Sequence, residues 1–371
     1  MKSIAIFLKL FLLNVCFLGN LPFVWAQLKD PVHQLDSLIN YYYESKQFSG
    51  SVLVAEGGAV IYDEHFGFQD IAETQKIGPE TVFEIASLSK AFSAVLVLKL
   101  VEAGKVELDQ PLSNYLSGFP YPEISIRHIL SHTSGLSERT FFAWAAKNMS
   151  LQETYTNEFI LDYLIQEHPA LSFAPGEAWE YSNLAYFLLP LLIEEMSSTP
   201  FITFLQEEIL HPLEMNYSGI YSQEFKGKQM QNYAFGKIYQ TDDESFRSAF
   251  GLAKSDSIYG SVGMLSNTSD LFIWDRALRS DLLLGSDLLE EAFTATKLKD
   301  GSSTHYGLGW FVHEAEEGDG RGKRVDHYGL WPGYESSIVR YIDRDICLII
   351  LSNQSPSAKD QLIKEISEIL F

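Results

Sequence analysis

Apolar residues change their spacing along the chain, and each spacing predicts a type of element. Over residues 31–46 they recur every three or four positions, which is the period of an amphipathic helix. Two apolar runs within 51–62 flank a Glu-Gly-Gly turn, which predicts a β-hairpin. A long apolar helix follows over 87–102, and Gly104 ends it.

The middle of the chain, residues 106–239, has helical patterns broken by prolines, and the last third returns to strands. These strands are expected at 307–312, 324–327, 336–341 and 346–351, with a closing helix at 360–371. Strands at both ends around a helical middle predict an α+β fold: an antiparallel sheet flanked by helices, with a helix-rich lobe inserted. We place the sheet lobe at about 27–105 and 240–371, and the helical lobe at about 106–239.

The first 26 residues have the pattern of a signal peptide. Lys2 precedes an apolar stretch that ends near Leu18, and small residues at alternate positions suit cleavage before Gln27. A membrane anchor is the alternative, but polar residues and a proline interrupt a stretch that is short for a spanning helix. We expect a periplasmic or extracellular protein with no integral membrane segment after cleavage. Cys16 leaves a lipid anchor as a further alternative.

Composition narrows the class of protein. The chain has 371 residues, of which 46% are hydrophobic, enough for an enzyme with a large core. Its formal net charge is −22, and it becomes −24 when Lys2 and Lys9 leave with the leader. Such a charge disfavours nucleic acid and anionic membranes as partners. After cleavage Cys347 is the only cysteine, within an apolar run, so we expect a buried core thiol and no intrachain disulfide.

A serine and a lysine three residues apart open the long apolar helix. Ser87 and Lys90 form an S-x-x-K pattern, and residues three apart share one helix face. A serine is a weak nucleophile until a neighbouring base takes its proton, and a lysine can be that base where burial lowers its pKa. Alone, the pattern also fits a helix-capping serine followed by a lysine whose amine reaches solvent. The pair is a candidate nucleophile and base.

A tyrosine and an asparagine two residues apart form the second candidate. Tyr181 and Asn183 follow a Pro-Gly turn, whereas a second copy, Tyr155-Thr156-Asn157, lies in the helix-like segment 153–165. We therefore select Tyr181 as a proton carrier between nucleophile and leaving group. Asn183 is expected to contact the substrate amide or to hold Lys90. In isolation the same pair is typical of a structural tyrosine hydrogen bond.

A histidine-tyrosine-glycine sequence occurs twice near the C-terminus. The copy at 305–307 continues into an alternation of glycine and aromatic residues that predicts a core strand. The copy at 327–329 precedes a tight turn, which predicts a strand edge. There Gly329 would let substrate lie along the strand. The Leu330 N–H would pair with the Ser87 N–H as an oxyanion hole. A lone histidine on a strand also fits an ordinary hydrogen-bonded group.

Taken in order, these motifs resemble the serine β-lactamase-related family, which includes class C β-lactamases, D-alanyl-D-alanine carboxypeptidases, D-aminopeptidases and related esterases. The resemblance extends from about 35 to 353. The sequences that carry it are Ile85-Ala86-Ser87-Leu88-Ser89-Lys90, Leu130-Ser131-His132-Thr133-Ser134-Gly135-Leu136, Pro175-Gly176, Tyr181-Ser182-Asn183, Tyr306-Gly307-Leu308-Gly309-Trp310, His327-Tyr328-Gly329 and Pro332-Gly333-Tyr334.

The resemblance implies a β-lactamase/transpeptidase-like fold with the site between its two lobes. It implies that Ser87 is acylated, that Lys90 activates it and that Tyr181 is a second proton carrier, with no metal and no cofactor. It also implies that Asn183 and His327 complete the cleft as substrate-binding residues. His132 is expected to be structural. The third motif departs from the frequent Lys-Thr-Gly, because Tyr328 stands where many members have a short hydroxyl residue.

We therefore expect a secreted serine hydrolase that acts on small-molecule esters or D-amino-acid peptides, with peptidoglycan fragments among the candidate substrates. The alternative is a non-catalytic cell-wall or ligand-binding module that keeps the fold. Intact Ser87, Lys90 and Tyr181 favour the enzyme, because a binding module does not need all three.

Overall fold

The computed structural model describes residues 30–149, 155–220, 232–243, 245–249, 258–316 and 318–371. The expected signal peptide, 1–26, lies outside these residues. Among the described helices, none alone is long and apolar enough to cross a membrane. The pair Asn183–Ser197 and Phe201–Leu210 meets that criterion only jointly, across a bend of 82°.

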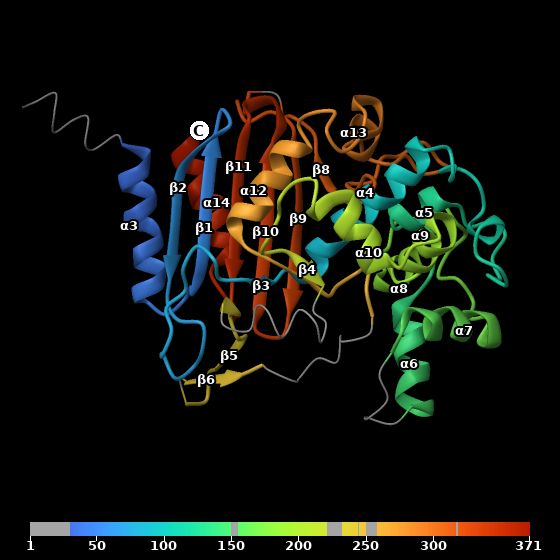
Figure 1. Cartoon of the computed structure of the whole chain (residues 1–371), viewed down its shortest axis with the longest axis horizontal. Helices are drawn as coiled ribbons and strands as arrows, with labels where there is room; N and C mark the ends of the chain where they lie inside the picture. The colour runs from blue at the N-terminus through green and yellow to red at the C-terminus, as the bar shows by residue number, and fades with distance from the viewer. Residues whose placement is uncertain (1–29, 150–154, 221–231, 244, 250–257, 317) are drawn as a thin grey trace, which may run out of the picture.

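A six-stranded antiparallel sheet forms the centre of the sheet lobe and contains strands from both ends of the chain (Figure 1). Its order is β2-β1-β11-β10-β9-β8, so the N-terminal hairpin pairs with a C-terminal strand. The strands are β1 (Gly50–Glu56), β2 (Ala59–Phe66), β8 (Phe311–His313), β9 (Arg324–Trp331), β10 (Tyr334–Tyr341) and β11 (Ile346–Ser352). The α+β fold with an antiparallel sheet is confirmed.

Helices cover both faces of this sheet, and the strand period of two explains how. In β11, Leu348 and Ile350 pack toward α3 (Pro31–Glu44) and α14 (Lys359–Leu370). Their neighbours Cys347 and Ile349 belong to the larger core on the opposite face. A strand covered on both faces must be apolar throughout, which is why this run shows no alternation. Cys347 is free and buried, as expected.

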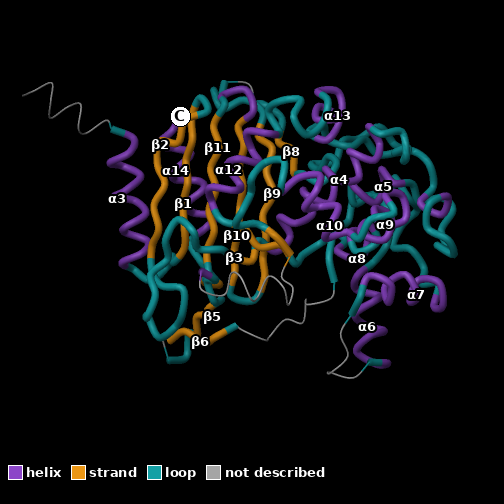
Figure 2. Tube along the Cα trace, viewed as in Figure 1, coloured by secondary structure: helices purple, strands orange, loops and turns teal. Residues whose placement is uncertain are grey.

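The opposite face carries α12 (Thr268–Ala277), which packs on β1 and β11, while α4 (Ser89–Glu102) lies beside the β8 edge against α9 (Leu189–Ser197) and α10 (Phe201–Leu205). The remaining helices gather beside the β8 edge (Figure 2). They are α5 (Ile126–Leu130), α6 (Glu138–Asn148), α7 (Asn157–Glu167), α8 (Asn183–Tyr186), α9 (Leu189–Ser197), α10 (Phe201–Leu205), the π-helical turn Gln206–Leu210 and α13 (Ser286–Ala292). Short 3₁₀ turns occur at Ala86–Leu88, Leu112–Asn114 and Ile342–Arg344.

Two three-stranded sheets complete the fold. Their orders are β3-β7-β4 and β12-β5-β6. These strands are β3 (Phe83–Glu84), β4 (Gly219–Ile220), β5 (Lys237–Gln240), β6 (Ser245–Ser248), β7 (Met264–Ser266) and β12 (Gln354–Ser355). β4 and the start of β5 fall within 106–239, the range expected for the helical lobe. The lobe boundaries drawn from the sequence stay a prediction.

Two of the expected elements need correction. The strand expected at 307–312 begins only at Phe311, because Gly307 and Gly309 lie in a loop pressed against neighbouring helices. A Cβ at Gly307 would lie 2.2 Å from the carbonyl oxygen of Ala292, and Gly309 has a φ of +89°. The long helix is regular only from Ser89, and Ser87 lies in the 3₁₀ turn before it.

This 3₁₀ turn packs directly on β9 and β10. Ser336 of β10 donates a hydrogen bond of 2.7 Å to the Ile85 carbonyl. A Cβ added to Gly329 of β9 would lie 2.2 Å from the same carbonyl oxygen and 3.0 Å from the Ala86 Cβ. Ala86 itself has a φ of +49°, a strained value for a residue with a side chain. The glycine thus lets the sheet hold the backbone that presents Ser87.

We expect Gly329→Ala to lower the free energy of unfolding by about 1–3 kcal/mol, the usual cost of overpacking, and to reduce turnover because the Ser87 turn must move. Gly78→Ala is the matched control, because no atom lies within 4 Å of a Cβ built there. Chemical denaturation measures the unfolding free energy of both variants, and steady-state kinetics measures their turnover. Equal effects of the two substitutions would contradict the packing argument.

Candidate active site

The Lys90 amine contacts the Ser87 hydroxyl inside the protein. The Nζ atom lies 3.1 Å from Ser87 Oγ, 2.7 Å from Asn183 Oδ1 and 3.2 Å from the Ser261 carbonyl oxygen. Lys90 is completely buried, whereas Ser87 is partly exposed. The predicted pair of Ser87 and Lys90 is therefore in contact, and Asn183 of α8 contacts Lys90 as well.

The surroundings of Lys90 favour a neutral amine. Burial lowers the pKa of Lys90 well below its ordinary value, and the Glu138 carboxylate acts in the opposite direction without reversing the shift. Of the three neighbouring oxygens, the Asn183 amide and the Ser261 carbonyl can only accept. A neutral amine donates its two hydrogens to them, and its lone pair then faces the Ser87 hydroxyl. This is the arrangement a general base requires.

Tyr181 lies on the other side of Ser87. Its ring centroid is 4.7 Å from Lys90 Nζ, and its hydroxyl shares a hydrogen bond with the Ser87 side chain. Burial raises the pKa of Tyr181, and the Ser87 hydrogen bond works against that rise. The environment therefore shifts the two pKa values in opposite directions, which favours the neutral amine of Lys90 and the protonated hydroxyl of Tyr181. Such a pair supplies a base and an acid at one site.

Asn183 is fixed from two further directions. Its Oδ1 also accepts a hydrogen bond of 2.6 Å from Ser261 Oγ, and its backbone N–H donates to Glu138 at 2.9 Å. Because Oδ1 faces Lys90 and Ser261, the amide nitrogen is the group that Asn183 can offer to a substrate. Ser261 and Glu138 were not found from the sequence. They come from separate segments, and no spacing relates them to Ser87.

His327 lies beneath the site rather than at its surface. Its side chain is fully buried, and its Nδ1 lies 2.8 Å from the Tyr328 carbonyl oxygen. Since a carbonyl only accepts, Nδ1 carries the proton, and burial lowers the pKa of His327 to about 3. The other nitrogen, Nε2, therefore accepts from the Tyr306 hydroxyl at 3.0 Å. Both ring nitrogens are engaged, which differs from the expectation that His327 binds substrate directly.

Tyr306 belongs to the copy of the third motif that the sequence reasoning set aside. The copy at 305–307 is not a core strand, yet its tyrosine is fully buried and supports His327. The His132 ring lies between the same groups, with its centroid 4.3 Å from the Tyr181 ring and 4.8 Å from the Tyr306 ring. Its Nδ1 accepts the backbone N–H of Ser182. His132 thus orients the Tyr181 segment, which fits the structural role expected for it.

The other tyrosine-asparagine copy lies elsewhere. Tyr155 precedes α7 instead of lying in it, because Thr156 caps the helix and the helix begins at Asn157. The expected helix-like segment is thus wrong at its start, and 150–154 lie outside the described residues. The Tyr155 ring packs on Phe141, 5.3 Å between centroids, and no described contact links it to Ser87.

β9 continues past its edge neighbour toward the nucleophile. β8 pairs with β9 only as far as Asp326, so 327–331 extend beyond the last partner on that side. Leu330 in this stretch is 56% exposed, and Gly329 packs on the turn that holds Ser87. The assignment of the Leu330 and Ser87 N–H groups to an oxyanion hole stays a prediction. Gly329 itself faces Ile85 and Ala86 rather than open space.

Cations near the third motif are each bound to a carboxylate. Arg324 pairs with Asp326 at 2.8 Å, and Lys359 pairs with Asp360 at 2.5 Å. A third cation, Arg340, is completely buried and lies farther along β10. In the described part of the chain, no cluster of three or more histidine, cysteine or acidic side chains could hold a metal ion.

Comparison with known proteins identifies the family of this chain. The beta-lactamase family model matches residues 35–369. The chain belongs to the beta-lactamase family. Penicillin-binding protein 4* of Bacillus subtilis (strain 168) is 34% identical over 345 residues, which cover 91% of this chain and 75% of that protein. Protein flp of Staphylococcus aureus (strain MW2) is 24% identical over 348 residues, which cover 91% of this chain and 66% of that protein.

Solved structures agree on the β-lactamase/transpeptidase-like fold. A penicillin-binding protein from Bacillus halodurans superposes with a TM-score of 0.75 at 27% identity, over 90% of this chain and 98% of that one. A D-amino acid amidase from Ochrobactrum anthropi SV3 superposes with a TM-score of 0.75 at 19% identity, over 91% of this chain and 99% of that one. The chain is thus a beta-lactamase-family serine hydrolase that resembles penicillin-binding proteins.

Exchange of one tyrosine hydroxyl tests the selected motif. We expect Tyr181→Phe to slow turnover by about 100-fold or more, because it removes a positioned proton carrier. Tyr155→Phe removes the same atom from the unused copy and should leave kcat within about twofold. Steady-state kinetics on one chromogenic ester compares them. A larger loss in Tyr155→Phe would show that the wrong copy was chosen.

The neutral lysine predicts a pH-dependent stability difference. Unfolded Lys90 holds its proton up to about pH 10.5, whereas the folded protein releases it at lower pH. Wild-type stability therefore gains from Lys90 as pH rises from the folded pKa to about 10.5. Lys90→Met lacks this gain, so its unfolding free energy relative to wild type should fall with rising pH, while turnover is lost throughout. Denaturant melts from pH 5 to 9 measure the unfolding free energy of both proteins. If the value for Lys90→Met minus the value for wild type rose with pH, a depressed pKa of Lys90 would be contradicted.

Proposed function

We propose that this protein is a secreted hydrolase that cleaves small esters or D-amino-acid peptides through an acyl-enzyme on Ser87. One observation carries the proposal: the buried Lys90 amine faces the Ser87 hydroxyl, while its hydrogens have other acceptors. A lysine held in this way has no structural partner of opposite charge at hydrogen-bond distance. Its arrangement is explained by catalysis.

The proposed reaction has two halves that use the same groups. The Ser87 oxygen attacks the substrate carbonyl carbon, and the serine proton passes to Lys90. As the tetrahedral intermediate collapses, the bond to the alcohol or amine breaks, and Tyr181 relays a proton to that leaving group. Water then attacks the Ser87 ester, and its proton follows the reverse route, so that the acid is released and Ser87 is restored. The N–H groups of Ser87 and Leu330 are assigned to stabilise the oxyanion.

Charge near the third motif favours neutral substrates. His327 is uncharged at neutral pH, since burial lowers its pKa to about 3, and Arg324 and Lys359 are paired with carboxylates. Tyr328 is 41% exposed and stacks on Phe311 with 5.0 Å between ring centroids. Among the described residues, this edge of β9 therefore offers no uncommitted cation for a substrate carboxylate. A neutral ester does not need one.

Export is proposed from the leader-like residues 1–26. A periplasmic or extracellular enzyme would meet peptidoglycan fragments, and the named relatives of B. subtilis and B. halodurans are penicillin-binding proteins. We therefore keep peptidoglycan-derived D-amino-acid peptides as the second substrate class beside esters.

We expect kcat/KM for p-nitrophenyl butyrate to exceed that for nitrocefin at both pH 6 and pH 8. The preference should persist at the lower pH because His327 stays neutral there. Nitrocefin turnover equal to or above the ester rate would show that a carboxylate-binding group exists at this edge.

Covalent labelling separates the enzyme from a non-catalytic module. A fluorophosphonate should add one label to wild type at Ser87 and none to Ser87→Ala, by intact mass and peptide mapping. The substitution should leave the unfolding free energy within about 1 kcal/mol, since Ser87 is partly exposed. A persistent label at another residue would overturn the nucleophile, and absence of labelling and turnover in wild type would favour the binding module.

A further inference from the structure

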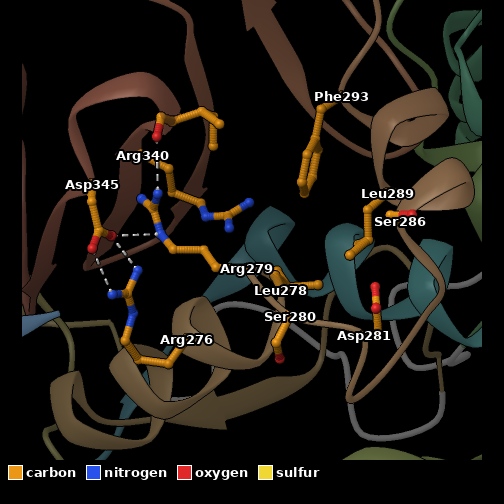
Figure 3. A pocket seen from close by; sticks show the side chains of 11 residues that line it. Arg276, Leu278, Arg279, Ser280, Asp281, Ser286, Leu289, Phe293, Arg340 and Asp345 are labelled. Carbon is orange, nitrogen blue, oxygen red and sulfur yellow. Dashed lines mark hydrogen bonds and ion pairs between the residues drawn. The ribbon is translucent and has the colours of Figure 1, made fainter. Parts of the chain in front are cut away.

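A pocket of about 630 Å³ lies between α12, α13 and one end of the sheet, away from Ser87 (Figure 3). The Arg340 guanidinium points into it, with Arg279 beside it and the apolar side chains of Leu289 and Phe293 opposite. None of these residues takes part in the acyl site.

The pocket and the acyl site both contact β10, but at different points along the strand. Ser336 of β10 lies opposite Gly329, beside the turn that carries Ser87, whereas Arg340 lies opposite Val325. Residues 336 and 340 point to the same face of the sheet, since they are an even number apart. Four residues of strand separate them by about 13 Å. A ligand at Arg340 therefore does not contact Ser87.

Arg340 is only partly satisfied by the protein. Its Nε donates to Asp275 Oδ1 at 2.7 Å, and both groups are completely buried. The two terminal nitrogens have no hydrogen-bond partner, and the guanidinium lies over the Phe293 ring, 4.8 Å from its centroid. Buried N–H groups without acceptors are costly, and a structural ion pair to Asp275 uses only one of the five. The remaining donors face the pocket.

The arginines at the pocket outnumber the carboxylates that they contact. Arg276 and Arg279 both contact Asp275 and Asp345, so three guanidinium groups share two carboxylates. Asp281 lies on an exposed part of the lining, and no described ion pair joins it to these arginines. A local positive excess contrasts with the formal net charge of −22 for the whole chain. The excess matches one monoanionic group.

We propose that this pocket binds a small organic carboxylate. The two terminal nitrogens of Arg340 form a planar fork, which fits the two oxygens of a carboxylate in a bidentate hydrogen bond. Phe293 and Leu289 then contact the apolar body of the ligand. Because three guanidinium groups contact two carboxylates, the excess of one charge favours a monoanion over a phosphate dianion. The site is separate from catalysis and does not depend on the proposed esterase activity.

Benzoate, acetate and phosphate are the probes, each titrated at constant ionic strength against Ser87→Ala protein, so that the acyl reaction plays no part. Thermal unfolding and calorimetry should show saturable binding of benzoate, weaker binding of acetate and little effect of phosphate. Absence of a benzoate effect would overturn the proposal. A phosphate effect as large as that of benzoate would overturn the carboxylate assignment.

Two further proteins locate the binding. Arg340→Lys keeps a cation for Asp275 but removes the fork, and it should lose at least tenfold in benzoate affinity. Ser286→Trp fills the pocket from the α13 wall without changing any arginine, and it should also abolish binding, whereas Ser286→Ala should not. Unchanged affinity in a folded Arg340→Lys or Ser286→Trp protein would overturn the site. A crystal soaked with 4-bromobenzoate gives an independent result, since its bromine must appear in this pocket.

Discussion

A single buried amine sets the requirements for the whole active site. The Lys90 side chain has no exposed surface, so the folded protein must supply oxygen acceptors for its hydrogens. These come from Asn183 at the start of α8 and from the Ser261 carbonyl in the loop before β7, while Ser87 lies one turn earlier along the same chain. Parts of the chain far apart in sequence must therefore meet at one atom. The chemistry follows from that packing, because burial makes the lysine a base and the nearby tyrosine an acid.

The sheet is the rigid support for this arrangement. Ser336 binds the Ile85 carbonyl, and Gly329 allows the nucleophile turn to approach β9 closely enough for that bond. Ala86 is held at a positive φ between these contacts, and a strained residue next to a nucleophile persists only when its surroundings are firmly packed. Helices cover both faces of the sheet, so movement of β9 or β10 would disturb two hydrophobic cores at once.

Two fully buried basic side chains, Lys90 and Arg340, differ in how completely the protein satisfies them. Lys90 has an acceptor for each available hydrogen when it is neutral, and its position is explained by proton transfer. Arg340 stays charged and is bonded through Nε alone, with two nitrogens unpartnered at the edge of a pocket. The difference follows from the side chains themselves, because an amine can lose its charge on burial and a guanidinium does not. A buried guanidinium therefore calls for an anion where an amine does not.

The sequence alone predicted the N-terminal hairpin, the C-terminal strands of the antiparallel sheet and the adjacency of Ser87 and Lys90, because these depend on short-range spacing and on the burial pattern of each segment. It also separated Tyr181 from Tyr155 through the local Pro-Gly turn. Only the tertiary structure decided that His327 faces inward and is held by Tyr306, and that Ser261 and Glu138 fix Asn183. The same holds for the clustering of three arginines around two carboxylates. Such contacts join residues far apart in the chain, and the direction of a side chain across a strand depends on what packs against each face, which spacing along the sequence does not encode.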